Sequence, residues 1–231
     1  PLTLLVTAPF GRHATHKFGP QISNRLGWIV MESPAIWFFS WVFFSGVQSE
    51  TTAAWFLWGL WMFHYMHRGV VFPIRIRTRG KQMPVLVIAL AFLFQIVNGF
   101  LNGVAISSLG EKYRAEWFSQ PVFWIGLLLF AAGLLVNLKA DNTLLNLRKR
   151  GDVGYGIPQG RLFEKVSCPN FLGEIVQWTG WAIMCWNLAA LSFAVWTFAN
   201  LVPRALSHHR WYQENMDNYP PERKAIFPGL L

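Results

Sequence analysis

The stretch PVLVIALAFLFQIVNGFLNGVAI, residues 84–106, decides the fold class of this chain. It contains no charged side chain, and it is long enough to cross a hydrocarbon core of about 30 Å, which takes about 20 helical residues. Five other apolar stretches are as long or nearly so, and none alternates with the period of a strand. The six predicted spans are Gly27–Val47, Ala53–Val71, Pro84–Ile106, Pro121–Lys139, Phe171–Trp186 and Leu188–Val202. We therefore expect an all-α, polytopic membrane bundle, with the last two spans forming a tight hairpin at Asn187.

Composition agrees with a bilayer environment. Hydrophobic residues make up 53% of the chain, aromatic residues 16% and charged residues only 13%, whereas a soluble domain usually carries about a quarter of charged residues. Tryptophan and tyrosine collect at membrane interfaces, and the chain has thirteen tryptophans. Cys168 and Cys185 stand in no metal-binding or redox spacing, so we expect both to be packing residues.

Basic residues alternate across the predicted spans. The four segments on one side hold 3, 5, 6 and 4 of the twenty Lys and Arg residues, and the loops on the other side hold only Lys112 and Arg114. These four segments are Arg12–Arg25, Arg68–Lys81, Lys139–Lys165 and Arg204–Lys224. The positive-inside rule makes this side, with the C-terminus, cytoplasmic. The same distribution argues against nucleic-acid binding, although the net charge is +9.

Polar groups inside the spans are functional candidates, because a membrane interior makes them costly. Glu32 lies five residues into the first span, where it could hold a proton and donate a hydrogen bond; a glutamate paired with an arginine at the interface is the alternative. Pro34 should weaken the helix beside it. Tyr65, in His64-Tyr-Met-His-Arg68, is either an interfacial anchor or a second donor to a carbonyl oxygen.

A second set of polar residues lies at the predicted cytoplasmic side. Asn137 and Asp141 are spaced i, i+4, and Asn170 and Glu174 repeat that spacing. With nearby arginines and histidines they predict a pocket wall for a ligand that carries phosphates and ribose hydroxyls. A basic rim that attracts anionic lipid headgroups is the alternative, and it explains the arginines but not the amides and carboxylates.

Three other interpretations are weaker. The glycine-rich stretch Gly151–Gly156 lacks the strand that precedes a dinucleotide fingerprint. Pairs such as His13-x-x-His16 resemble fragments of di-iron histidine boxes, but the HxxxH spacing is absent, so we expect no metal site. A transporter would usually show repeated halves, and none is visible.

Taken together, these residues resemble the steroid 5α-reductase family of NADPH-dependent membrane reductases, in order along nearly the whole chain. The matching pieces are Trp28…Glu32-x-Pro34, His64–Arg68, Asn137-x-x-x-Asp141, Leu147–Lys149, Tyr155–Gly160, Asn170–Trp178, Arg204–Tyr212 and Tyr219–Pro228. Related enoyl reductases and isoprenylcysteine methyltransferases share the C-terminal part, whereas the Glu32 and His-Tyr motifs favour the steroid branch.

The resemblance implies one domain over residues 1–231 with seven transmembrane helices, so Pro1–Ala8 would be the end of a truncated first helix. It implies hydride transfer from NADPH to C5 of a 3-oxo-Δ4-steroid, with Glu32 and Tyr65 hydrogen-bonded to the 3-keto oxygen. Trp178 would lie near the nicotinamide and the steroid. The implied NADPH-site residues are Asn137, Asp141, Arg148, Tyr155, Asn170, Glu174, Arg204, His208 and Tyr212.

Several questions stay open at this point. A polyprenol or an enoyl thioester is the alternative substrate, and membrane lipid is the expected surrounding partner. A monomer is compatible with the sequence. The membrane is either a bacterial inner membrane, if the chain is a bacterial homologue, or the endoplasmic reticulum.

Overall fold

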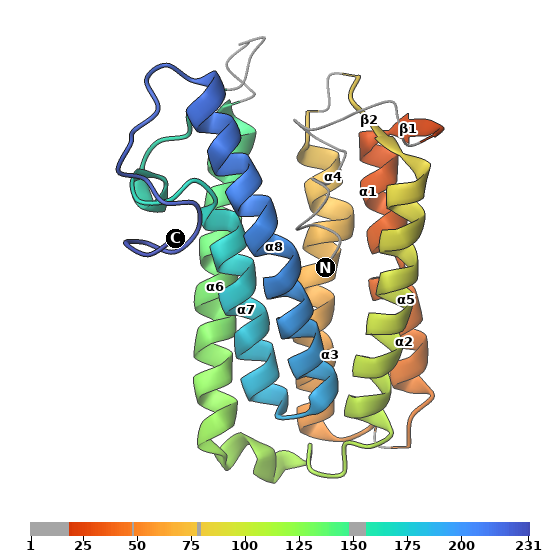
Figure 1. The fold of residues 1–231 in the computed structure, drawn as a ribbon. Coiled ribbons are helices and arrows are strands. Elements are labelled where there is room, and N and C mark those ends of the chain that lie inside the picture. The colour runs from red at the N-terminus through yellow and green to blue at the C-terminus, as the bar shows by residue number, and fades with distance from the viewer. Residues whose placement is uncertain (1–18, 48, 78–79, 148–155) are drawn as a thin grey trace. The chain divides into compact units, whose positions relative to one another are not determined.

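The computed structural model describes residues 19–47, 49–77, 80–147 and 156–231. Almost every described element is a helix (Figure 1). The chain divides into two compact units. Among the described residues, the first unit takes in the chain up to Trp124 together with Ile183–Ala190, and the second takes in Ile125–Ala182 and Leu191–Leu231.

The first unit is built around a pair of helices that pack closely, α2 and α5. Gly103 of α5 lies so near α2 that a Cβ atom there would be 2.7 Å from Cγ1 of Val42. One turn earlier, Gly99 packs against Phe39. The elements of this unit are β1 (Gln21–Ser23), α1 (Asn24–Glu32), α2 (Pro34–Phe44), α3 (Thr52–Met66), the π-helical η4 (His67–Val71), α4 (Phe72–Arg75), β2 (Gln82–Pro84), α5 (Val85–Ser107) and the 3-10 helix η5 (Ala115–Ser119).

The two short strands form an antiparallel pair that the sequence did not predict. Ile22 of β1 is paired with Met83 of β2, which joins the start of α1 to the start of α5. The Met83 side chain is fully buried and packs with Met31 and Ile88 in a small apolar cluster. The pair therefore fixes α1 beside α5 at one end.

Pro34 divides the first predicted span into two helices, as expected. It has no backbone N–H to donate to the carbonyl of Val30, so the helical bond between these residues cannot form. The hydroxyl of Ser33 donates to that carbonyl instead, at 2.9 Å. Helix α1 consequently ends at Glu32 and α2 begins at Pro34.

The second unit contains two helices in close backbone contact, α6 and α7. A Cβ atom on Gly133 of α6 would lie 2.3 Å from the backbone nitrogen of Gln177, and one on Gly180 of α7 would lie 2.3 Å from that of Phe130. Small residues at such interfaces let membrane helices associate through backbone packing. The elements here are α6 (Pro121–Leu147, beginning in the first unit), the 3-10 helix η7 (Arg161–Glu164), α7 (Pro169–Cys185) and α8 (Leu188–Asn215).

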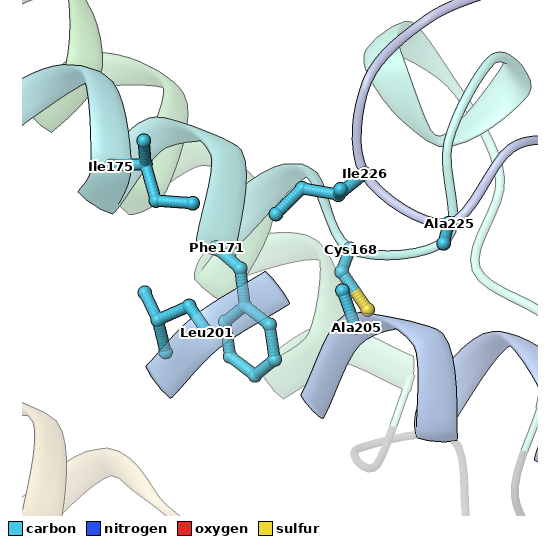
Figure 2. Packing of buried hydrophobic residues seen from close by; sticks show 7 residues of the cluster. All are labelled: Cys168, Phe171, Ile175, Leu201, Ala205, Ala225 and Ile226. Atoms are coloured by element: carbon cyan, nitrogen blue, oxygen red, sulfur yellow. The ribbon is translucent and has the colours of Figure 1, made fainter. Parts of the chain in front are cut away.

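The C-terminal segment folds back onto α7 and α8. Ala225 and Ile226 pack against Cys168, Phe171 and other apolar residues of these helices, as Figure 2 shows. Backbone hydrogen bonds join Ser167 N to Lys224 O at 2.8 Å and Cys168 N to Ala225 O at 3.1 Å. Cys168 is therefore a packing residue, as predicted.

The predicted hairpin between the last two spans is confirmed. Helix α7 ends at Cys185 and α8 begins at Leu188. The Asn187 side chain accepts a hydrogen bond from the backbone N–H of Ala190 at 2.8 Å, so it caps α8. It also donates to the hydroxyl of Tyr113, which donates in turn to the Cys185 carbonyl at 2.6 Å. Burial raises the pKa of Tyr113, so this hydroxyl keeps its proton.

The fold is that of an all-α polytopic membrane protein, and four helical segments of the described residues, one of them α1 and α2 taken together, are long and apolar enough to span a bilayer. These are Asn24–Phe44, Val85–Ser107, Pro121–Leu147 and Leu188–Asn215. The second predicted span is a helix that runs without interruption from Thr52 to Arg75. The fifth is α7, whose 17 residues reach about 25 Å.

One predicted boundary is wrong. The fourth span was expected to end at Lys139, but its helix, α6, continues for two turns beyond that residue, to Leu147. Asn137 and Asp141 therefore stand on one continuous helix.

Candidate active site

The first candidate centre is a buried trio of polar side chains in the first unit. Glu32, Tyr65 and Gln95 come from α1, α3 and α5, and each is less than 9% exposed. The amide nitrogen of Gln95 donates to Oε2 of Glu32 at 2.7 Å. The hydroxyl of Tyr65 donates to the amide oxygen of Gln95 at 3.4 Å. Both predicted catalytic residues therefore bind one shared partner.

An arginine and a glycine of the π turn face Glu32. Nε of Arg68 lies 4.0 Å from Oε1 of Glu32, which is a long ion pair. The guanidinium also lies over the rings of Trp28 and Phe72, 4.6 Å and 5.3 Å from their centroids. Gly69 lets the turn approach, since a Cβ atom there would stand 3.2 Å from Cβ of Glu32. Glu32 is thus both buried and paired with an arginine, which was the alternative interpretation of this residue.

Two further amides extend this trio along α5. Asn98 donates to the amide oxygen of Gln95 at 3.4 Å, and Asn102 donates to the side-chain oxygen of Asn98 at 3.0 Å. All three amides are buried. Their spacing of three and four residues places them on one face of the helix.

The second candidate centre is in the second unit, where α6 and α7 pair. The amide of Asn137 donates to the backbone carbonyl of Asn170 at 3.0 Å, and the amide of Asn170 reaches Oδ1 of Asp141 at 3.4 Å. Asn137 and Asp141 are buried. Glu174 is half-buried one turn after Asn170 on α7. Three of the four predicted residues, Asn137, Asp141 and Asn170, therefore form one hydrogen-bonded group in which Asn170 bonds to both of the others.

Two predicted residues of α8 share an aromatic neighbour on α7. The guanidinium of Arg204 lies 5.4 Å from the ring centroid of Phe171, and the His208 ring lies 5.7 Å from the same centroid. Both side chains are half-buried. Arginine and histidine on one helix face supply the positive charge and the donors that a phosphate group needs.

Tyr212 is held in a cluster that ties α8 to the C-terminal segment. Its ring stacks on Tyr219 at 5.1 Å with an interplanar angle of 3°. The Tyr219 hydroxyl is hydrogen-bonded to Ser167, whose hydroxyl also lies 2.6 Å from Nδ1 of His209. Burial raises the pKa of Tyr219. This cluster fixes the position of Tyr212 rather than leaving it at a mobile helix end.

Arg223 is a buried residue that anchors the C-terminal segment. It is 2% exposed, donates to the Pro158 carbonyl at 2.9 Å and lies 3.7 Å from the Glu164 carboxylate. Its guanidinium also stands 5.4 Å from the centroid of the Tyr219 ring. A buried charge with these partners fixes Pro158 and Glu164, which precede α7.

Trp178 is buried in an aromatic core of the second unit. Its ring contacts Phe193 at 4.4 Å, Phe130 at 6.1 Å and Trp181 at 6.2 Å between centroids. Only 1% of its surface is exposed. Its predicted place beside the substrate stays a prediction.

The structure thus groups most of the predicted residues and adds several. Arg148 and Tyr155 lie outside the described residues. Sequence reasoning missed Gln95, although the rule that singled out Glu32 also applies to an amide inside an apolar span. It also missed the role of Ser167. Within the described residues, no group of three or more His, Cys, Asp or Glu side chains could hold a metal ion.

These features define a polytopic membrane protein with a buried acid–phenol–amide centre in one unit and an amide–carboxylate–arginine centre in the other. Residues 81–231 match the protein family described as 3-oxo-5-alpha-steroid 4-dehydrogenase. The chain is 41% identical over 227 residues to a steroid 5-alpha-reductase of Gossypium hirsutum, which covers 96% of this chain and 88% of that protein.

Animal relatives are similar along the same length. A 3-oxo-5-alpha-steroid 4-dehydrogenase 1 of Bos taurus is 38% identical over 234 residues, covering 100% of this chain and 90% of that protein. The Homo sapiens protein of the same name is 37% identical, with 96% and 86% covered. The chain belongs to the steroid 5α-reductase family, as its sequence motifs predicted, and is an oxidoreductase that acts on CH–CH bonds.

Proposed function

We propose that the protein reduces the Δ4 double bond of 3-oxo-Δ4-steroids to give 5α-reduced steroids, with NADPH as the reductant. The observation that carries this proposal is the buried trio, in which Glu32 and Tyr65 bind the same amide of Gln95. Family membership supports the reaction class.

Glu32 and Tyr65 act on the 3-keto oxygen. Reduction of a conjugated enone at C5 moves negative charge onto that oxygen, so donors aimed at it stabilise the enolate more than the ground state. A phenol and a carboxylic acid are both suitable donors. Burial strengthens the effect, because a site that excludes water does not screen these hydrogen bonds.

Glu32 must carry a proton in order to donate. The short bond from Gln95 occupies Oε2 of the carboxyl group as an acceptor. In this proposal the donated hydrogen bond comes from the carboxyl oxygen that carries the proton. Arg68, 4.0 Å from Oε1, is placed to stabilise the carboxylate if the proton leaves. C4 takes a proton to complete the reduction.

The polar residues of the second unit suit the chemistry of NADPH, which when bound supplies the hydride that reaches C5. Carboxylates such as Asp141 accept hydrogen bonds from ribose hydroxyls. The amide of Asn170 reaches Asp141, and the backbone carbonyl of Asn170 accepts from the amide of Asn137. Arg204 binds phosphate oxygens, and the ordered ring of Tyr212 gives a flat apolar surface beside them. The remaining cofactor-site residues in the proposal are Arg148, Tyr155, Glu174 and His208.

The test is oxidation of NADPH by the purified protein in detergent or nanodiscs when progesterone or testosterone is added. We expect steroid-dependent turnover, a 5α-reduced product by mass spectrometry, and faster turnover with NADPH than with NADH. Reduction of a polyprenol or an enoyl thioester, with none of the steroid, would contradict the proposed substrate. Glu50→Gln is the matched control for Glu32→Gln, since Glu50 is an exposed carboxylate.

A further inference from the structure

Gln95 is the one described side chain to which both Glu32 and Tyr65 are shown hydrogen-bonded. Its amide nitrogen faces the acid and its amide oxygen faces the phenol. Asn98, one turn along α5, donates to the same oxygen at 3.4 Å. Gln95 itself is 8% exposed, and Gly99 and Gly103 hold the helix that carries it against α2.

A glutamine matches these two neighbours because its donor and acceptor ends are separate. The acid accepts at Oε2 and the phenol donates, so an amide satisfies both at once. A hydrocarbon side chain of the same length would satisfy neither. Buried polar groups that lose a partner are costly, and they relieve that cost by moving.

We infer that Gln95 is a positioning residue, which holds the Glu32 carboxyl and the Tyr65 hydroxyl at the spacing that a single carbonyl oxygen requires. This inference rests on the proposed function. The bond to Glu32 is short, at 2.7 Å, and the bond to Tyr65 is long, at 3.4 Å. An arriving keto oxygen can therefore replace the Gln95 amide oxygen as the acceptor of the Tyr65 hydrogen bond, while the amide nitrogen of Gln95 still donates to Glu32.

The first test replaces Gln95 by a residue of similar length without an amide. Gln95→Met should lower kcat for steroid reduction, up to about a hundredfold, because misplaced catalytic groups lose that much. The affinity for NADPH should stay at the parental value, since the proposed cofactor residues belong to the other unit. Ser107→Ala is the matched control: it also removes a buried polar group of α5, one whose shown bonds are to the backbone carbonyls of Gly103 and Val42.

The second test uses pH. In Gln95→Glu the new carboxylic acid can still donate to Glu32 and accept from Tyr65 while it is protonated. When it ionises, it has no proton to donate to Glu32, and its negative charge is unfavourable beside that carboxyl group. The titratable or charged neighbours are Glu32 on α1, His64 and Tyr65 on α3, and Arg68 on η4. The rate of this variant relative to the parent should therefore fall as pH rises, and a role in packing alone would not produce that dependence.

A third measurement separates this inference from the proposed function. In a Glu32→Gln, Tyr65→Phe background, Gln95→Met should cause little further loss, since the groups it positions no longer act. A large further loss, or a pH profile of Gln95→Glu parallel to the parent, would overturn the inference. If the parental protein does not reduce the steroid, the proposed function fails. If Glu32→Gln and Tyr65→Phe reduce steroid at parental rates, the polarising pair lies elsewhere and the positioning role fails with it. If those two are slow while Gln95→Met is parental, only the positioning role fails.

Discussion

Gly173 of α7 faces Gly133 of α6 so closely that a Cβ atom on Gly173 would lie 2.7 Å from the Gly133 carbonyl oxygen and 2.5 Å from the backbone nitrogen of Asn137. The neighbours are backbone atoms, which cannot rotate away as a side chain can. The same approach of the two helices brings the Asn137 amide to the Asn170 carbonyl. Helix packing and the amide–carboxylate group of the second unit therefore depend on the same glycines.

Gly173→Ala should destabilise the protein and weaken NADPH binding together. Forcing a methyl group into a packed interface costs about 1–3 kcal/mol, and the helices must separate by some tenths of an ångström where Asn137 meets Asn170. The measurement is thermal unfolding in detergent with a cofactor titration. Gly59→Ala is the control, because a Cβ atom there meets nothing within 4 Å and alanine favours the helix. Equal melting temperatures for the two variants would contradict this account.

Tyr65→Phe and Glu32→Gln should slow steroid reduction without weakening cofactor binding. Tyr65→Phe removes a donor that acts mainly in the transition state, and Glu32→Gln replaces an acidic O–H by a weaker amide donor. Loss of such a donor costs roughly 3–4 kcal/mol, which is a rate loss on the order of 10² to 10³. Single-turnover reduction at saturating NADPH gives the rate, and titration gives the affinity. Near-parental rates for both variants would place the polarising pair elsewhere.

Asp141→Ala should weaken NADPH binding more than it slows steroid reduction. Asp141 is buried beside Asn170, so its loss removes an acceptor and leaves the amide of Asn170 without that partner. We expect a clear rise in the Kd for NADPH, by about tenfold or more if a charged hydrogen bond is lost, with a smaller change in single-turnover rate at saturation. Asp217→Ala changes an exposed carboxylate and serves as control. An unchanged Kd would remove Asp141 from the cofactor site.

The charge asymmetry predicts which loops face the cytoplasm. Cysteines introduced at Ser49 and Glu111 should react with an impermeant thiol reagent applied from outside intact cells or sealed vesicles, and one at Asn218 should not. The native Cys168 and Cys185 are buried, so the background should be low. Labelling of Asn218→Cys together with the other two, from one side, would contradict the orientation.

The sequence allowed the helices and the chemically unusual residues to be predicted, because both are local properties. Glu32 stands out as a charge in an apolar run, and Pro34 predicts a break by removing one backbone donor. Gln95 was missed for a different reason. Its importance comes from α1 and α3, which lie 63 and 30 residues away in the chain, and no local pattern states which faces of three helices meet.

The boundary of α6 shows a second limit. A predicted span ends where hydropathy falls, at Lys139, but a helix ends where its backbone bonds stop. Residues 140–147 include neither glycine nor proline, so nothing in the chain interrupts the helix there. Hydropathy therefore located the apolar segment and underestimated the length of the helix, which carries Asp141 as well as Asn137.

The π turn His67–Val71 makes the number of residues in this segment matter as much as their identity. A π turn holds one residue more than the α-helical turn it replaces. Deleting a single exposed residue such as Val70 would restore an ordinary helix and leave the residues after it on the faces they now occupy, whereas a deletion in an α-helical turn would rotate them by about 100°. Phe72, which packs against the Arg68 guanidinium, would keep its face of the helix only in the first case. When homologous chains are aligned, a one-residue gap inside this segment therefore implies that the π turn is an ordinary α-helical turn in the other chain. Such a gap should be accepted only where the motif from His64 to Arg68 keeps its register.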